Sequence, residues 1–480
     1  MPIARLLLAF VGLTLGLWGC SFAPKYQRPD APVPSSALPA APGASSASSS
    51  SASAASATED LALPSLSGFF LEPRLKALIE LSLLENRDLR MAALNVLAAR
   101  AEYGVAKADR YPNLELSVQT SLQGGPERST SRSHEVGLMA GFEMDFWGRL
   151  KNMSQAAYQR YLGVTEATRA ARLALIAEVA EAYLETRMTV ESLELTERTL
   201  ASWRSSLAFI EQRLISGQSA LLELEQARGQ VAKAEVTLAS AQTSLTRAEK
   251  KLKLLTGNLG EPVLPPALSL ANWPDPHLPD NVNSEYLLKR PDILAAEREL
   301  VASHADIGVA RAAFFPSLTL TGQFGYMSGQ LNSLLSKTNA GWGFSPNLTL
   351  PLFTGGRNRR NLDLAKIRRE QSVVNYEKAI QTAFQEVAEA LDARPKLAQE
   401  RQAQSRLLQT QKRVLELAAN RYQNGALSYL EVLEAQREVF EAQMATLDIR
   451  RSQILNDIKL YLALGGGLEP NPEIPRGDQL

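Results

Sequence analysis

An internal duplication places the strongest constraint on how this chain folds. Short segments of the first half return in the second half 204 positions later. The first-half segments are Asp88–Leu89, Gly104–Ala108 and Pro112–Leu116, and their counterparts are Asp292–Ile293, Gly308–Ala312 and Pro316–Leu320. The duplication predicts two copies of one unit, at residues 69–257 and 284–467, with a linker at 258–283 and a C-terminal tail at 468–480.

Each unit contains two segments in which apolar and polar side chains alternate. These segments are 113–123 and 135–146 in the first unit, and 317–327 and 341–353 in the second. A period of two predicts β-strands with one apolar face. Such strands are more common in the sheets of soluble proteins, but here long helical stretches bound each pair and leave no other sheet to join. About ten residues is also the length that crosses a bilayer at a tilt.

Four strands are too few to close a barrel in a membrane. An open sheet in lipid would leave unpaired backbone groups at its edges, and each such group costs several kcal/mol. The smallest closed barrels need about eight strands. We therefore expect the four strands of one chain to share a barrel with strands from other copies.

The rest of each unit predicts a pair of long helices. Apolar residues recur at alternating steps of three and four over 175–214 and again over 224–255, which is the spacing of a coiled-coil seam. We expect helical hairpins over 149–257 and 357–464. The first helix of such a hairpin would be on the order of 100 Å long, at 1.5 Å per residue. Pro395 falls inside the second hairpin and predicts a kink or an interruption.

The N-terminus predicts a secreted, lipid-anchored protein. Residues 1–19 contain a short apolar run, Leu6–Trp18, as expected of a signal peptide. Cys20 follows directly; it is the single cysteine of the chain and has no intramolecular disulfide partner. Its position resembles the bacterial lipobox, in which the thiol is acylated and becomes the first mature residue. Ser21 favours export to the outer membrane, and the Pro-, Ser- and Ala-rich segment 20–68 predicts a lipid-anchored tether.

Composition and motifs argue against several classes of function. The 51 basic and 51 acidic residues balance, so no general attraction to nucleic acid is expected. His134, His277 and His304 are far apart and lack Cys or Glu at metal-ligand spacing. The chain has no nucleophile elbow, phosphate loop or dinucleotide fingerprint. We expect a protein that is not an enzyme and that binds no metal and no cofactor apart from the lipid on Cys20.

Several segments, in this order and spacing, resemble the outer-membrane factor family. They are the Pro-Tyr-Pro segment after Cys20, Phe146–Gly148, Lys289–Ile293, Phe315–Leu318, Pro351–Gly356, Arg421–Arg437 and Leu464–Gly467. This family comprises the TolC and OprM-like channels, and the closest branch is the NodT-type lipoproteins of multidrug efflux. The resemblance implies a mainly α fold with membrane β: a homotrimer in which twelve strands form one outer-membrane β-barrel. A long α-helical coiled-coil barrel would continue it into the periplasm.

The resemblance also implies partners and site residues. The partners would be a periplasmic adaptor protein and an inner-membrane RND-type pump. The hairpin tips that contact the adaptor would lie at Gly217, Gly425, Arg213 and Arg421. The periplasmic gate would be formed by Leu430, Glu434 and Arg437, which share one helix face at spacings of four and three. From the residues alone, the last two also fit an ordinary exposed ion pair.

Two alternatives to a drug-efflux channel remain at this point. A type I protein secretion channel would have the same architecture. A non-conducting coiled-coil tether anchored through Cys20 would explain the helices and the lipid, but it would not explain strand pairs repeated at matching places in both units. Conduction by the purified protein separates a channel from a tether.

Overall fold

The structure is a computed structural model, and it describes residues 21–32, 64–125, 128–260, 262–276, 278 and 287–467. The signal peptide, Cys20, His277 and the C-terminal tail lie outside these residues. The chain divides into two compact units. The strand unit contains the described part of Met1–Ala31 with Ala93–Ala167 and Asp292–Ala379, and the hairpin unit contains the described parts of Pro32–Ala92, Thr168–Pro291 and Ile380–Leu480.

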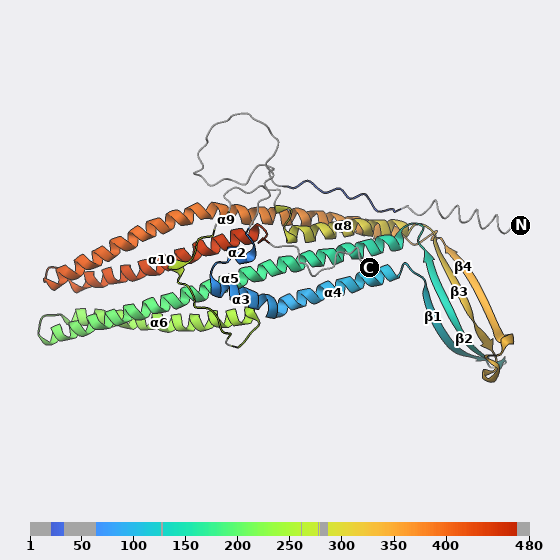
Figure 1. Ribbon diagram of the computed structural model, residues 1–480, viewed down its shortest axis with the longest axis horizontal. Helices are drawn as coiled ribbons and strands as arrows, with labels where there is room; N and C mark the ends of the chain where they lie inside the picture. The colour runs from blue at the N-terminus through green and yellow to red at the C-terminus, as the bar shows by residue number, and fades with distance from the viewer. Residues whose placement is uncertain are drawn as a thin grey trace, which may run out of the picture. The chain divides into compact units, whose positions relative to one another are not determined.

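The strand unit is organised around one antiparallel sheet in the order β1-β2-β3-β4 (Figure 1). Its strands are β1 Asn113–Gly125, β2 Arg128–Met144, β3 Ser317–Ser328 and β4 Ala340–Thr349. Two 3₁₀ turns, Leu331–Ser333 and Lys337–Asn339, lie between β3 and β4. The two halves of the chain meet at the β2–β3 pair, where Gly137 lies opposite Gly325. A Cβ on Gly325 would come within 2.4 Å of the Val136 carbonyl oxygen, so glycine permits this close approach.

The ends of two strands differ from the sequence-based expectation. β2 begins at Arg128 rather than at 135, because backbone pairing with β1 continues through a polar stretch that has no apolar alternation. β4 ends at Thr349 rather than at 353. The alternation of apolar residues continues to Leu352, but Pro351 has no N–H to donate to a strand ladder. The alternating pattern therefore extends further than the strand.

Six long helices make up most of the rest of the described chain. They are α4 Arg87–Ala108, α5 Arg149–Ile215, α6 Leu221–Thr256, α8 Pro291–Ala312, α9 Arg357–Gln423 and α10 Tyr429–Ala463. Of these, α4, α5 and α9 each run from the strand unit into the hairpin unit. Two shorter helices, α2 Leu66–Phe69 and α3 Pro73–Glu85, and the 3₁₀ turn Leu270–Asn272 complete the hairpin unit. Within the described residues, no helix is both long enough and apolar enough to cross a membrane.

The main core of the hairpin unit is an apolar cluster that brings α3, α5, α9 and α10 together. Phe69 stacks on the buried Tyr461 with ring centroids 3.9 Å apart. The buried Glu72 accepts a hydrogen bond from the Tyr183 hydroxyl (2.8 Å) and another from the Leu75 N–H at the start of α3. Burial, followed by this bond to Glu72, raises the pKa of Tyr183. The phenol is therefore a permanent donor to the carboxylate.

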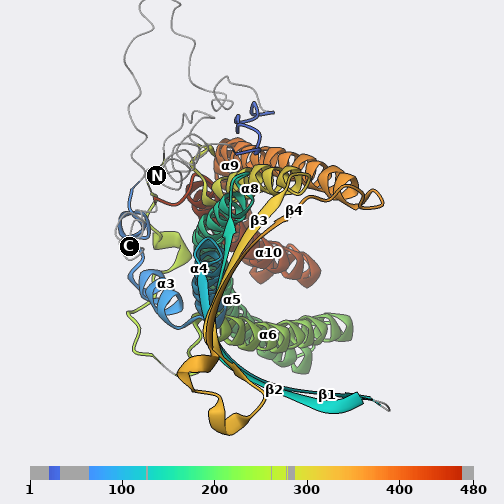
Figure 2. The same cartoon turned by 90° about the vertical axis from the view of Figure 1, so that its right-hand side faces the viewer.

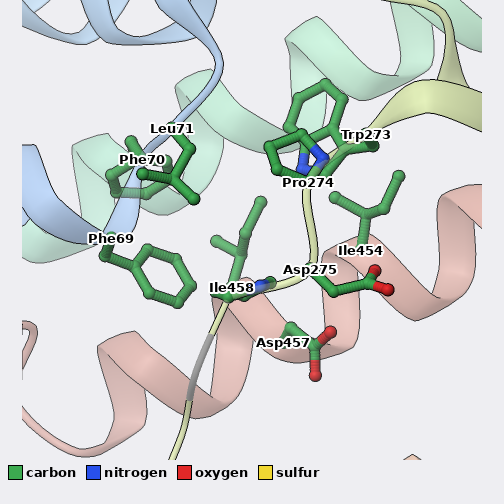
Figure 3. Close-up of a pocket in the computed structure, with 10 residues that line it drawn as sticks. Phe69, Phe70, Leu71, Trp273, Pro274, Asp275, Ile454, Asp457 and Ile458 are labelled. Carbon is green, nitrogen blue, oxygen red and sulfur yellow. The ribbon is translucent and has the colours of Figure 1, made fainter.

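A cavity of about 10 Å³ at the edge of this core is large enough for one water molecule (Figure 3). Phe69, Trp273 and Ile458 supply apolar walls, and Asp275 and Asp457 are its acidic side chains. Burial raises the pKa of Asp457, and the nearby Arg394 opposes this shift. A space this small and this polar is part of the structural core.

Pro395 does not interrupt its helix: α9 continues from Arg357 to Gln423. Side chains of α10 bond to α9 carbonyls on both sides of the proline. Asn456 donates to the Ala390 carbonyl oxygen (2.9 Å) and Gln453 donates to that of Leu397 (3.2 Å). These contacts fasten α9 to α10 on both sides of the proline.

Candidate functional site

One face of the sheet is apolar across all four strands. Register places the even-numbered residues of every strand on this face. One row across the sheet is Leu116, Leu138, Phe324 and Trp342, and these side chains are 70, 44, 55 and 80% exposed. On β2 the apolar residues run from Val136 to Met144, about 27 Å along the strand. This approximates the apolar band of outer-membrane barrel strands.

The opposite face carries the odd-numbered residues and is polar. Its members include Glu115, Gln119, Glu135, Thr321, Gln323, Ser345 and Asn347, with Met139 and Met327 as apolar exceptions. A sheet with one apolar and one polar face is suited to lie between lipid and water. Alternation within each strand predicted this division, and the register between strands extends it over the whole sheet.

Both outer edges of the sheet are open. β1 pairs only with β2 and β4 pairs only with β3 among the described residues. The outward N–H and C=O groups of β1 and β4 therefore lack strand partners within this part of the chain. Exposed strand edges of this kind recruit strands from other chains.

An aromatic cluster lies where the sheet joins the helices. Phe22 stacks on Phe315 with centroids 4.6 Å apart, and Trp147 lies 4.8 Å from Phe315. The Trp147 indole N–H donates to the Pro316 carbonyl oxygen (2.7 Å), just before β3 begins. Arg149 forms two bonds with Glu143 at the end of β2 (2.9 and 2.7 Å). Tryptophan in such a position is typical of a membrane interface.

The N-terminal segment 21–32 is fixed to the strand unit by a polar cluster that the sequence alone did not predict. Glu297 on α8 accepts from the Tyr26 hydroxyl (2.8 Å) and from Arg28 (2.7 Å). Arg28 also donates through Nε to the hydroxyl of the buried Tyr376 on α9 (3.1 Å). Burial, and then the bond to Glu297, raises the pKa of Tyr26. The Pro-Tyr-Pro resemblance was the only sequence signal for this contact.

The two predicted tip glycines end helices in the same way. Gly217 and Gly425 have φ of 75° and 71°, in the left-handed region. After α5 the Gln218 N–H donates to the Arg213 carbonyl oxygen (2.8 Å), and after α9 the Ala426 N–H donates to that of Arg421 (2.9 Å). This is the hydrogen-bond pattern of a Schellman helix end, which glycine favours.

The two tips are joined by packing and charge. The Arg213 guanidinium lies 5.0 Å from the centre of the Tyr422 ring, in the geometry of a cation–π contact. Ile210 and Leu224 of the first hairpin pack in one cluster with Tyr422 and Tyr429 of the second. Burial raises the pKa of Tyr429 to about 12. Arg213 is therefore partly structural, whereas Arg421 is exposed.

The predicted gate residues lie one turn apart on α10. Leu430 is 45% exposed, Glu434 is exposed and Arg437 is half-buried. Arg437 lies 3.9 Å from Glu438 and 3.8 Å from Glu441. In the described part of the chain no ion pair joins Glu434 to Arg437, so the simple intrachain pair allowed by their spacing is not formed.

No group of three His, Cys, Asp or Glu side chains that could hold a metal ion occurs among the described residues. His134 contacts Thr120 (3.0 Å) on β1, and His304 is buried in the helical part of the strand unit. The predicted lipidation site, Cys20, lies outside the described residues.

Comparison with known proteins gives consistent matches along the chain. The family model described as outer membrane efflux protein matches residues 78–258 and 282–466. The cation efflux system protein CusC of Escherichia coli is 42% identical over 457 residues, covering 95% of this chain and 98% of CusC. The probable outer membrane lipoprotein SilC of Salmonella typhimurium is 40% identical, covering 94% of this chain and 96% of SilC.

A solved structure extends the comparison to the fold. The crystal structure of the open state of the Neisseria gonorrhoeae MtrE outer membrane channel matches with a TM-score of 0.83 at 35% identity. The match covers 94% of this chain and 99% of the MtrE chain. The resemblance therefore includes the strands, the hairpins and their connections.

Proposed function

The chain belongs to the outer membrane efflux protein family, a family of transport proteins, and from this membership we propose that it is the outer-membrane channel of a tripartite efflux system. The channel conducts small solutes passively once its periplasmic end opens. An inner-membrane RND-type pump supplies the energy and a periplasmic adaptor joins the two. The name of CusC, a cation efflux system protein, favours efflux of small solutes over protein secretion.

The observation that carries this proposal is the sheet with one apolar face and two open edges. In a homotrimer, β1 of each copy pairs with β4 of the next, and twelve strands close one barrel. The even-numbered face contacts lipid and the odd-numbered face contacts water. Closure removes the unpaired edges that make a four-stranded sheet impossible in a bilayer.

Disulfide cross-linking between copies tests this closure. We expect Ser117→Cys on β1, combined in turn with Gly343→Cys, Ser345→Cys or Asn347→Cys on β4, to give cross-linked dimers and trimers for at least one pair. All four positions belong to the polar face. The measurement is a non-reducing gel of protein oxidised in outer-membrane vesicles.

Matched controls separate closure from random collision. Gln119→Cys with Glu135→Cys joins β1 to β2 within one chain and should leave the chain a monomer on the gel. If every β1–β4 pair also remains monomeric, the shared barrel is wrong. If the cross-linked trimer gives no current in a planar bilayer, the protein is a tether and not a channel.

Lipid anchoring and docking complete the proposal. The acyl chains on Cys20, after removal of residues 1–19, hold the N-terminal segment at the membrane; the lipoprotein SilC supports this. The tips at Gly217 and Gly425, with the exposed Arg421, contact the adaptor. The two repeats, at 69–257 and 284–467, supply equivalent strand pairs and hairpins to the assembly.

A further inference from the structure

The strand unit contains a second polar site that channel formation does not require. A cavity of about 370 Å³, open on one side, lies between the N-terminal segment, α8 and α9. Its size is within the range of small-molecule sites. The lining residues are Pro24, Lys25, Gln27, His304, Ile307, Arg311, Lys366, Arg369 and Glu370. Three elements distant in sequence thus converge on one space.

The lining of this cavity is strongly cationic. Lys25, Arg311, Lys366 and Arg369 contribute four positive charges, and Glu370 contributes the single carboxylate. Glu370 is bonded to Arg369, so it offsets only that charge. His304 adds none at neutral pH, because burial and then Arg369 lower its pKa. Three cations therefore face one small space without a local counter-charge.

The uncompensated charge indicates an external anion. Within the described residues, none of Lys25, Arg311 and Lys366 forms an ion pair with a carboxylate. Arg311 uses one N–H to donate to the Phe22 carbonyl oxygen (2.9 Å), which holds the N-terminal segment over the cavity. Arg311 is half-buried, whereas Lys25 and Lys366 are exposed, so water screens part of their mutual repulsion and a bound anion would remove the rest. Arginine and lysine together are typical of phosphate sites.

The position of the cavity identifies the source of the phosphate. Arg311 lies in the last turn of α8, six residues before β3 begins. Phe22, whose carbonyl oxygen accepts from Arg311 of the cavity lining, stacks on Phe315 at the end of the sheet. If the sheet lies in the membrane, as proposed above, the cavity opens just beneath the headgroup layer, where basic clusters attract anionic lipid.

We propose that this cavity binds the phosphate of an anionic phospholipid headgroup from the periplasmic leaflet. Lys25 and Lys366 supply mobile point charges, and Arg311 and Arg369 supply planar donors. Through Lys25 and Arg311 the lipid also contacts the N-terminal segment. The inference rests on the proposed placement of the sheet in the membrane but not on conduction.

The test measures lipid binding to the full-length acylated protein in detergent. Native mass spectrometry would titrate phosphatidylglycerol, with diacylglycerol as a lipid that lacks phosphate. We expect saturable binding of phosphatidylglycerol only, weakened about tenfold or more by Lys25→Gln with Lys366→Gln. The matched control is Lys107→Gln with Lys378→Gln, two exposed lysines outside the cavity, with the same loss of charge.

The outcomes distinguish the alternatives. Equal loss of binding in both double variants, or no loss in the first, would overturn the proposal. Displacement of the lipid by millimolar inorganic phosphate would assign the cavity to a soluble phosphate and overturn the lipid assignment. Bilayer current of wild-type protein in neutral lipid tests the channel separately: lipid binding without current would reject conduction and leave this site intact.

Discussion

At the scale of single residues, a few side chains hold the N-terminal segment in place. Tyr26 and Arg28 share Glu297, and Tyr26 also lies edge-on to His304 with ring centroids 5.6 Å apart. His304 in turn accepts from Arg369 (3.4 Å). None of these contacts follows from spacing in the sequence, since the N-terminal residues lie about 270 positions from their partners on α8 and His304 lies 65 positions from Arg369. They depend on a fold that brings α8 beside the N-terminal segment.

His304 should make this region sensitive to acid. Its pKa is lowered in the folded state by burial and by Arg369, so the unfolded chain binds the proton more readily. Stability should therefore fall as the pH drops below about 6.5, the ordinary value for histidine. We expect the thermal midpoint of the wild type to decrease by a few degrees between pH 8 and pH 5.5, and to decrease less in His304→Gln.

His134→Gln is the matched control, because His134 lies in β2 outside this region. Thermal unfolding followed by circular dichroism at pH 8 and pH 5.5 gives the change in thermal midpoint for each protein. The same change in His304→Gln and wild type would contradict the role assigned to His304. Neither variant substitutes Tyr26, Arg369 or Glu370, the side chains near the His304 ring.

At the scale of elements, the alternation of side chains predicted four strands, and the described part of the chain contains four. The order and register of the strands could not be predicted from the sequence, because they depend on which strands lie next to one another in the fold. The start of β2 was missed since polar residues carry no alternating signal. Of the kink or interruption predicted at Pro395, the interruption does not occur, since α9 continues through the proline, where side chains of α10 bond to its carbonyls on both sides. Helix-ending glycines were predictable, since the left-handed conformation at positions 217 and 425 is a local property.

The division of the sheet into two faces gives a test with adjacent residues of β2. Leu138 belongs to the apolar face and Met139 to the polar face. Arginine on the lipid side near the middle of the membrane costs about 2–4 kcal/mol. We expect Leu138→Arg to reduce heat-stable trimer in outer-membrane fractions strongly, whereas Met139→Arg leaves most of it. Equal loss for both variants, measured on a gel without boiling, would contradict the assignment of faces.

At the scale of the whole molecule, the open question is how the channel closes at its periplasmic end. Glu434 is exposed on α10 and has no ion-pair partner within the described residues, while Arg437 is only loosely held by Glu438 and Glu441. In a trimer each Glu434 is free to pair with a sister chain. We propose that Leu430, Glu434 and Arg437 form the closed constriction.

A double variant examines the gate. Glu434→Ala with Arg437→Ala should increase single-channel conductance and antibiotic leakage, because removing the charges weakens contacts between copies. Glu225→Ala with Arg228→Ala is the matched control: this pair on α6 has the same spacing of three and is also exposed (3.0 Å). Unchanged conductance in the first variant, or an equal rise in the control, would exclude the gate.

The pairing of β2 with β3 restricts where insertions and deletions can occur in the sequence of such a protein. Figure 2 shows the four strands as one continuous curved surface, although the first two and last two come from different halves of the chain. Every strand keeps its even-numbered residues on one face of the sheet. Inserting one residue within β2 would therefore move the side chains after it to the opposite face, whereas the turns between strands tolerate insertions. The offset between the halves is 204 at Pro112 and Pro316 but 208 at Gly217 and Gly425, and this difference has to be absorbed outside the paired strands. Genes for such proteins are thus expected to vary freely in their turns and only by substitution in their strands.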